Sequence, residues 1–197
     1  AINTPTYKLS QYLNELLKPF TVNDYTAKDS FTFAADVRSQ DLSAFMASLD
    51  VDSLFTNIPL TETINICSNL LFRDKDTIDN LTKDDFIHLL TIATTDSFLL
   101  FNGDYYQQID GVAMGSPLGP TLANIFLGYN EINWLANCPN EFKPLYYRRY
   151  VDDIFLLFAN ADSLNKFKGY MNHQHQNMNF TSEAETYNSN PFLDVFV

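Results

Sequence analysis

The stretch RRYVDDIFLLF, residues 148–158, decides the fold of this chain. Aromatic and aliphatic residues typical of strands lie on both sides of Asp152 and Asp153. Two acidic residues between two such runs indicate a hairpin with an acidic two-residue turn. Aspartates are also common as plain turn formers, so these two residues alone fit a structural role as well as a chemical one. Arg148 and Arg149 are adjacent in a strand and must point to opposite faces, so at most one faces a nucleic acid, and a surface ion pair explains them equally well.

A second strand ends in acidic residues far from the first. Residues 44–51, AFMASLDV, read as a largely buried strand that carries Asp50 near its end and is followed by Asp52. We therefore expect two acidic strand ends to meet. Like charges brought together need a cation, and carboxylate oxygens suit Mg²⁺, which also recruits substrate phosphates. Two such ions about 3.5–4 Å apart are typical of phosphoryl-transfer sites.

The rest of the chain mixes helices with short strands. Apolar residues at helical spacing, together with capping residues and prolines, predict helices over residues 5–18, 31–38 (capped by Ser30), 61–71, 83–93, 120–134 and 162–171. FLLF, Asn102-Gly103 and DYYQQ form a hairpin signal with a type I′ turn. Thr82 and Asp85 resemble a capping box. Residues 179–185 and 191–197 read as a last strand pair.

Composition narrows the class of protein. The chain has 197 residues, of which 46% are apolar, and its formal net charge is −12. The length and apolar content predict one packed domain, and the charge argues against simple electrostatic adhesion to nucleic acid or an anionic membrane. We find neither a signal peptide nor a spanning segment and expect an intracellular protein with no membrane partner. The first residue is Ala, which suggests a fragment of something longer.

Four stretches in order resemble the palm motifs of reverse transcriptases, specifically those of Penelope-like retroelements. They are SLDVDSLFTNIPL (48–60), QIDGVAMGSPLGP (108–120), RRYVDDIFLLF (148–158) and FTSEAETYNSNPFLDV (180–195). The opening TPTYKLSQYL, residues 4–13, also resembles the start of these proteins. The FTxExE lead and the FLD ending of the fourth stretch favour this branch over retroviral or intron enzymes.

The resemblance implies an α+β fold, the right-hand polymerase palm, with a small mainly antiparallel sheet and helices packed on one face. It covers nearly the whole chain, so residues 1–197 are expected to form a single reverse transcriptase (palm) domain fragment. Residues 1–42 would be a helical lead-in with partial fingers character, and residues 43–197 would carry the palm motifs. Fingers, a thumb and, in many members, a GIY-YIG endonuclease would lie in other segments of the parent protein and supply the missing positive charge.

The resemblance also assigns the catalytic carboxylates. Asp50 matches the first metal ligand of the family because the family's aromatic gate lies five residues after that aspartate, where this chain has Phe55. Asp152 and Asp153 complete the set, with Asp152 the more essential. Asp52 is then a solvated strand-end acid. The cofactor implied is Mg²⁺, as two ions, with Mn²⁺ as a substitute.

Further residues match the substrate and primer motifs of the family. Phe55, Met114, Gly115 and Tyr150 are the implied substrate-binding residues, and Phe55 would exclude a 2′-hydroxyl and so select deoxynucleotides. Many reverse transcriptases have Gln where Met114 stands, so a polar contact from that position is not expected here. The implied primer-binding residues are Phe192, Leu193 and Asp194, although a buried terminal strand has the same pattern.

The activity implied is RNA-directed DNA synthesis, with transfer of a nucleotide from a dNTP to a primer 3′-hydroxyl. The expected partners are an RNA template, a DNA primer and dNTPs, and the expected site of action is the nucleus. The alternative is a catalytically inactive retroelement remnant that serves as an RNA-binding or assembly module. An RNA-dependent RNA polymerase is disfavoured by Phe55.

Overall fold

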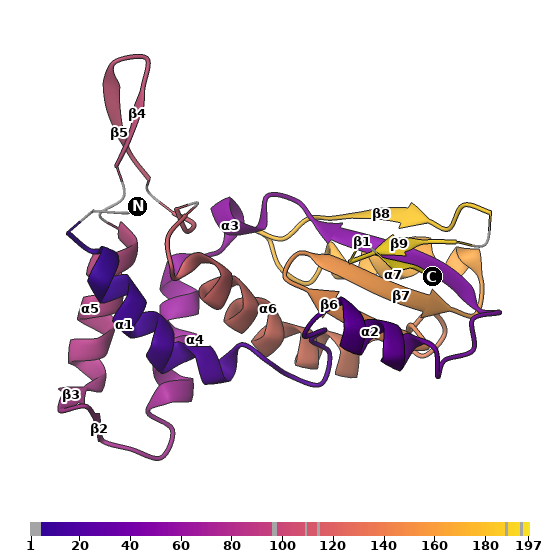
Figure 1. Cartoon of the computed structure of the whole chain (residues 1–197), viewed down its shortest axis with the longest axis horizontal. Helices are drawn as coiled ribbons and strands as arrows, with labels where there is room; N and C mark the ends of the chain where they lie inside the picture. Colours follow the sequence, from indigo (N-terminus) through magenta and orange to yellow (C-terminus); the bar gives the residue numbers. More distant parts are fainter. Residues whose placement is uncertain (1–4, 96–97, 109, 114, 188, 194) are drawn as a thin grey trace. The chain divides into compact units, whose positions relative to one another are not determined.

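The computed structural model describes residues 5–95, 98–108, 110–113, 115–187, 189–193 and 195–197 (Figure 1). The chain forms two compact units, each built from two separate segments: residues 1–21 with 55–129, and residues 22–54 with 130–197. Neither unit has a boundary at residue 42, where the sequence predicts the lead-in to end, and that division stays a prediction. Among the described residues, no helix combines the length and the apolar character needed to cross a bilayer.

The second unit is built on a four-stranded antiparallel sheet (Figure 1). Its strands, in spatial order, are β6 (Tyr146–Tyr150), β7 (Asp153–Phe158), β1 (Phe45–Val51) and β8 (Phe180–Ala184). The same unit contains the helices α2 (Ser30–Val37) and α7 (Ala161–Met171), and the short strands β9 (Pro191–Phe192) and β10 (Val195–Phe196). The mixed helices and antiparallel sheet confirm the expected α+β palm.

The two faces of this sheet are covered differently. On one face, Glu131 from the C-terminal part of α6 (Gly119–Ala136) bonds to Arg149, and Phe167 of α7 packs on Phe158, with ring centroids 5.6 Å apart. On the other face, Phe33 of α2 packs on Phe155, with ring centroids 5.3 Å apart. The ends of β1 and β7 on that second face stay exposed, and this is where Asp50 and Asp153 lie.

The β6–β7 turn differs by one residue from the sequence prediction. The turn residues are Val151 and Asp152, and Asp153 is already the first residue of β7, paired with Tyr150. Val151 has a φ of 57°, in the left-handed region. A two-residue turn of this kind needs a positive φ, and here a β-branched residue supplies it at an energetic penalty, because the branched side chain crowds the backbone. The turn is therefore strained, and the acidic pair is divided between turn and strand.

The first unit is mainly helical. Its elements are α1 (Tyr7–Leu17), η1 (Lys18–Phe20), α4 (Leu60–Leu71), β2 (Thr77–Ile78), β3 (Leu81–Thr82), α5 (Lys83–Thr95), β4 (Phe98–Phe101) and β5 (Asp104–Gln107), while α3 (Leu54–Asn57) lies at its boundary. The capping box is confirmed, since the backbone N–H of Thr82 donates to Asp85 Oδ2 at 3.0 Å and that of Asp85 donates to Thr82 Oγ1 at 3.2 Å. Asn102 and Gly103 have φ values of 52° and 91°, as a type I′ turn requires.

Two local predictions are wrong. The N-cap of α2 is Asp29 and not Ser30, because the Asp29 carboxylate accepts from the backbone N–H of Thr32 at 2.7 Å. The last two segments do not pair with each other: β8 pairs with β1, and the terminal segment folds back on itself as β9 and β10. Leu193, with a φ of 51°, lies between β9 and β10 and reverses the chain there.

Candidate active site

A row of exposed side chains crosses the sheet at its acidic end. In the strand register Asp50 lies directly opposite Asp153, and Asp153 lies directly opposite Tyr150 on its other side. Thr181 of β8 extends the row beyond Asp50. Side chains that are directly opposite share a face, with Cβ atoms about 4.5–5.5 Å apart. The fold therefore places two carboxylates and a phenol side by side, although Asp50 is about a hundred residues from Tyr150 and Asp153 in the sequence.

The carboxylates repel one another. Partial burial and the charge of Asp152, followed by those of Asp52 and Glu183, raise the pKa of Asp50 above its usual range. Partial burial and the charges of Asp152 and Asp50 likewise raise the pKa of Asp153. Asp152 thus lies close enough to act electrostatically on both. Asp50, Asp152 and Asp153 carry like charges, and no cationic residue is among the causes of the pKa shifts. The site therefore favours a ligand that brings positive charge.

The carboxylates can be compared with the ligand set of Mg²⁺, the metal that the resemblance implies. Among the described residues, no group of three or more His, Cys, Asp or Glu side chains is arranged so that it could hold a metal ion. These side chains therefore do not form a complete protein cage. Two directly opposed carboxylates do fit a cation that takes its other ligands from water and substrate phosphates, as Mg²⁺ commonly does.

A groove of about 460 Å³ lies beside the acidic row. Its lining includes Asp50, Asp153, Glu183, Phe192 and Leu193. Phe192 is only 4% exposed and its ring centroid lies 4.6 Å from that of Phe33, so it is mainly a core residue that also lines the groove. Asp194 lies outside the described residues. Sequence reasoning did not assign Glu183 to the site, although its position in the FTxExE lead was a signal that could have found it.

The glycine-rich segment and Phe55 lie together in the first unit. The backbone N–H of Val112 donates to the carbonyl of Phe55 at 2.7 Å. Gly111 has a φ of 74°, and a Cβ there would lie 2.8 Å from the Phe55 carbonyl oxygen and closer still to Thr56. Only glycine allows this approach, so the segment holds the backbone of Phe55 in place. Gly115 is exposed, with open space where a Cβ would lie, and Met114 lies outside the described residues.

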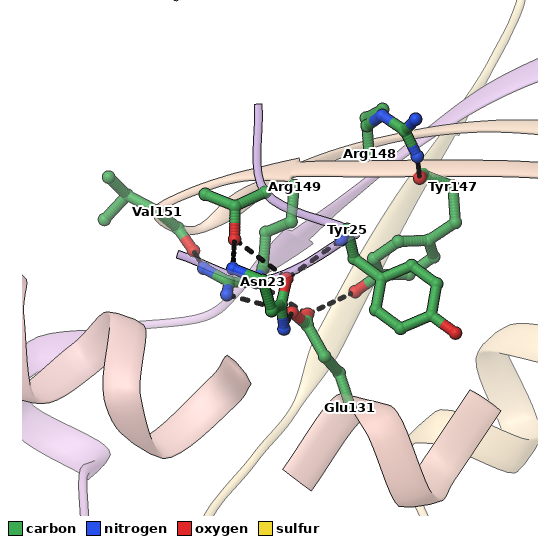
Figure 2. Close-up of polar contacts among 8 residues, drawn as sticks. Asn23, Tyr25, Glu131, Tyr147, Arg148, Arg149 and Val151 are labelled. Carbon is green, nitrogen blue, oxygen red and sulfur yellow. Dashed lines mark hydrogen bonds and ion pairs between the residues drawn. The ribbon is translucent and has the colours of Figure 1, made fainter. Parts of the chain in front are cut away.

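Asp52 and the two arginines are also placed by the structure. Asp52 follows β1 and is exposed, as a solvated strand-end acid would be. Arg148 and Arg149 point to opposite faces, as expected. Arg148 forms an ion pair with Asp36 at 2.8 Å. Arg149, in contrast, is fully buried and pairs with Glu131 at 2.7 Å (Figure 2). The expectation of a surface pair is wrong for Arg149, and the sequence carried no signal that named Glu131 as its partner.

Comparison with known families agrees with this geometry. Residues 2–185 match the model of the family described as Reverse transcriptase (RNA-dependent DNA polymerase). The chain belongs to the reverse transcriptase family. The match includes Asp50, Phe55 and the Asp152-Asp153 pair.

Individual relatives of this reverse transcriptase domain are telomerases. The telomerase reverse transcriptase of Oryza sativa subsp. japonica is 29% identical over 111 residues, which are 51% of this chain and 9% of that protein. The solved structure of apo telomerase from Candida tropicalis matches with a TM-score of 0.71 at 12% identity, over 98% of this chain and 39% of that one. A telomerase structure from Candida albicans, solved with a TWJ fragment of telomeric RNA, matches with a TM-score of 0.69 at 12% identity over 94% of this chain and 36% of that one. The chain thus spans less than half of the length of each of these relatives, and the structural likeness confirms the fold.

Proposed function

We propose that this chain is the palm of an RNA-directed DNA polymerase that extends a DNA primer on an RNA template with dNTPs. The observation that carries the proposal is the strand register that sets Asp50 opposite Asp153, with Asp152 in the adjacent turn. Membership of the reverse transcriptase family supports RNA-templated DNA synthesis over other phosphoryl transfers. The net charge of −12 disfavours an RNA-binding role that does not involve cations.

Asp50, Asp152 and Asp153 are the residues that would hold the divalent cations. When bound, two Mg²⁺ ions would stabilise the negative charge that develops on the phosphates during nucleotide transfer. The carboxylates serve as ligands and not as general bases, and the exposed position of Asp50 and Asp153 leaves them open to a triphosphate. Tyr150, 40% exposed and directly opposite Asp153, would border the substrate on the far side of this pair.

Phe55 would select the sugar. Its backbone is held by Val112 and Gly111, and its ring lies 3.7 Å from the position of a Cβ on Gly119. A ring held in this way excludes a 2′-hydroxyl by shape, and discrimination by shape alone is modest. Phe55→Ala is therefore expected to raise the ratio of ribonucleotide to deoxynucleotide incorporation roughly 10- to 200-fold. An unchanged ratio in competing primer extension would refute the gate.

We further propose that the parent protein belongs to a Penelope-like retroelement and acts in the nucleus. The FTSEAE lead and the FLD ending of residues 180–194 support this branch. In such a protein, Phe192, Leu193 and Asp194 would border the primer, and the groove beside Asp50 and Asp153 supports that position for Phe192 and Leu193. Fingers and thumb segments elsewhere in the parent protein would bind most of the nucleic acid.

Primer extension on an RNA template by the full-length protein tests the proposal. Asp152→Asn is expected to lower kcat by at least 10² to 10³-fold, on the order seen when one group that stabilises the transition-state charge is removed. Asp52→Asn is the matched control: its charge acts on Asp50 only from a distance, and its exposed side chain lies outside the acidic row, so kcat should change far less than in Asp152→Asn. Activity that survives Asp152→Asn, or no RNA-templated synthesis by the unmodified protein under any divalent cation, would favour the inactive remnant instead.

A further inference from the structure

The face of the sheet opposite the acidic row carries a buried ion pair next to the same turn. Arg149 is 0% exposed, and its partner Glu131 is 1% exposed. Arg149 Nε donates to Glu131 Oε2 at 2.7 Å, and Nη2 donates to Glu131 Oε1 at 3.1 Å, so the two side chains meet as a two-pronged fork (Figure 2). A planar guanidinium bound in this way has one orientation.

The remaining arm of that guanidinium reaches the turn that carries Asp152. Nη1 of Arg149 donates to the carbonyl oxygen of Val151 at 3.0 Å (Figure 2). Val151 is the residue whose φ of 57° is unfavourable for a β-branched side chain. Strained backbone of this kind persists only where its surroundings over-determine it. The hydrogen bond from Arg149 is one contact that can hold this strained backbone, because it binds the peptide unit that joins Val151 to Asp152.

Both partners are themselves held firmly. The backbone of Arg149 bonds on its outer side to residues 25–27, through Arg149 N–H to the Tyr25 carbonyl and Ala27 N–H to the Arg149 carbonyl, each at 2.8 Å. Glu131 also accepts from Asn23 Nδ2 at 2.7 Å and from the Tyr147 hydroxyl at 3.2 Å. Burial raises the pKa of Tyr147 well above its usual value, so the phenol stays a donor. These contacts hold the ion pair on several sides, so we expect the turn to adapt to the pair and not the pair to the turn.

We propose that Arg149 and Glu131 are positioning residues that hold the strained Val151–Asp152 turn, and through it the carboxylates of Asp152 and Asp153, in the conformation used for nucleotide transfer. The inference rests on the proposed function, since it assigns the pair to the same reaction. A buried ion pair contributes little to stability compared with well-packed apolar residues, so stability alone does not account for it. Placement of the carboxylates accounts for the ion pair, because a displacement of reacting groups by about 1 Å can lower the rate about 10²-fold.

Arg149→Lys tests the inference in the full-length protein. Lysine keeps a cation beside Glu131 but has no fork with which to hold Glu131 and the Val151 carbonyl together. We expect kcat for primer extension to fall about 10- to 100-fold while KM for the dNTP changes less than about two-fold, since uniform binding is not removed. Independently of activity, amide hydrogen exchange in residues 150–154 should become faster. Arg148→Lys is the matched control, because Arg148 binds Asp36 and does not contact the turn, and it should leave kcat and exchange unchanged.

A rescue experiment separates positioning from a purely structural role. Glycine adopts a positive φ without penalty, so Val151→Gly removes the strain that Arg149 opposes. The loss of kcat caused by Arg149→Lys should therefore be smaller in the Val151→Gly background than in the unmodified protein, by at least roughly three-fold in a double-mutant cycle. Equal losses in the two backgrounds would overturn the inference.

A second variant controls for loss of folding. If circular dichroism shows that Arg149→Lys is unfolded, Arg149→Met combined with Glu131→Gln removes both charges. The Gln oxygen can still accept from Asn23 Nδ2, and the Gln amide N–H can donate to the Tyr147 hydroxyl. Unmodified kcat in whichever variant folds would overturn the inference, and so would loss of the fold in both variants even with Val151→Gly, because the pair would then be structural. Failure of the proposed function looks different: there, Asp152→Asn itself would leave primer extension unchanged.

Discussion

The β6–β7 hairpin carries unbalanced charge on one face of the sheet and balanced charge on the other. Asp50 and Asp153 lie exposed beside each other, and their pKa values are raised partly by their mutual proximity and by Asp152. On the other face, Arg149, the residue before Tyr150 in β6, is buried and forms a two-pronged ion pair with Glu131. No cationic group is among the causes of the raised pKa values of Asp50 and Asp153, so an incoming cation would balance the charge of these carboxylates. The buried face is already complete, and its balance fixes the backbone that presents the other face.

This difference explains how one short hairpin can be both strained and stable. Alternate residues of a strand point to opposite faces, so the same backbone serves the acidic row and the ion pair. The repulsion among the carboxylates and the left-handed Val151 both destabilise the folded state. The apolar residues of β7 and the fork of Arg149 hold the hairpin in place. Four measurements test the difference between the two faces.

The largest effect is expected from the buried face. Glu131→Gln leaves the Arg149 guanidinium buried without its carboxylate, so we expect the free energy of unfolding to fall by about 3–5 kcal/mol. Urea unfolding followed by circular dichroism measures it. Glu141→Gln is the control, because Glu141 is 72% exposed in its ion pair with Lys166 and should lose no more than about 1 kcal/mol. Equal losses in the two variants would remove the contrast between the faces.

The next effect is expected from a ligand on the acidic face. A divalent cation that binds only the folded protein stabilises it by about 1.4 kcal/mol at ten times its dissociation constant. For a chain of this size, that corresponds to a rise in Tm of about 3–6 °C. Thermal unfolding with MgCl₂ and then with excess EDTA should show the rise and its loss. The combined Asp50→Asn and Asp153→Asn variant should show neither; an equal rise in that variant would place the cation elsewhere.

A smaller effect is expected from the arginine next to Arg149. Arg148 is paired with the partly exposed Asp36 and lies over the ring of Tyr146, 4.9 Å from its centroid. Arg148→Met should lower the free energy of unfolding by only about 0.5–1 kcal/mol, because water screens the pair. The shift of the urea midpoint relative to that of Glu131→Gln gives the comparison directly. A loss as large as that of Glu131→Gln would mean that exposure does not distinguish the two pairs.

The smallest effect is a gain in stability. The pKa of Asp50 is raised in the folded protein above its ordinary value of 3.8, so ionisation destabilises the fold at neutral pH and the penalty vanishes below about pH 3.8. Water screens this repulsion, so Asp50→Asn should raise Tm at pH 7 by only about 1–2 °C and should leave Tm near pH 3 unchanged. Thermal unfolding at both pH values measures this. A gain at pH 3, or a loss at pH 7, would contradict mutual repulsion.

The strands and helices were largely predictable because their signals are local. Runs of aliphatic and aromatic residues marked β1 and β7, Thr82 with Asp85 marked the start of α5, and Asn102-Gly103 marked a hairpin turn. Errors fell where two neighbouring residues could both act as a cap, or where tertiary pairing chose the partner of a strand. Asp29 capped α2 in place of Ser30, and β8 paired with β1 instead of with the terminal segment. The turn at Val151 was displaced by one residue because Asp153 pairs with both Asp50 and Tyr150.

The acidic residues were found from the sequence because carboxylates at strand ends are chemically distinctive and their motifs follow one another in a known order. Glu183 was missed since a carboxylate on an edge strand has no meaning until its neighbours are known. Arg149 was missed as a buried residue for the same reason. Sequence alternation placed it opposite Arg148, but no pattern pointed from Arg149 to Glu131 on a helix.

Local chemistry in the sequence determined which residues are suited to the proposed reaction. These are the paired aspartates, Phe55 with the glycine-rich segment, and the apolar strands in which the aspartates lie. Tertiary structure alone decided which of them meet. Antiparallel pairing of β1 with β7 brought Asp50 to Asp153, and burial of Arg149 selected Glu131 as its partner. The physical reason is that register and burial are properties of the whole packed sheet, whereas propensity and turn chemistry are properties of a few consecutive residues.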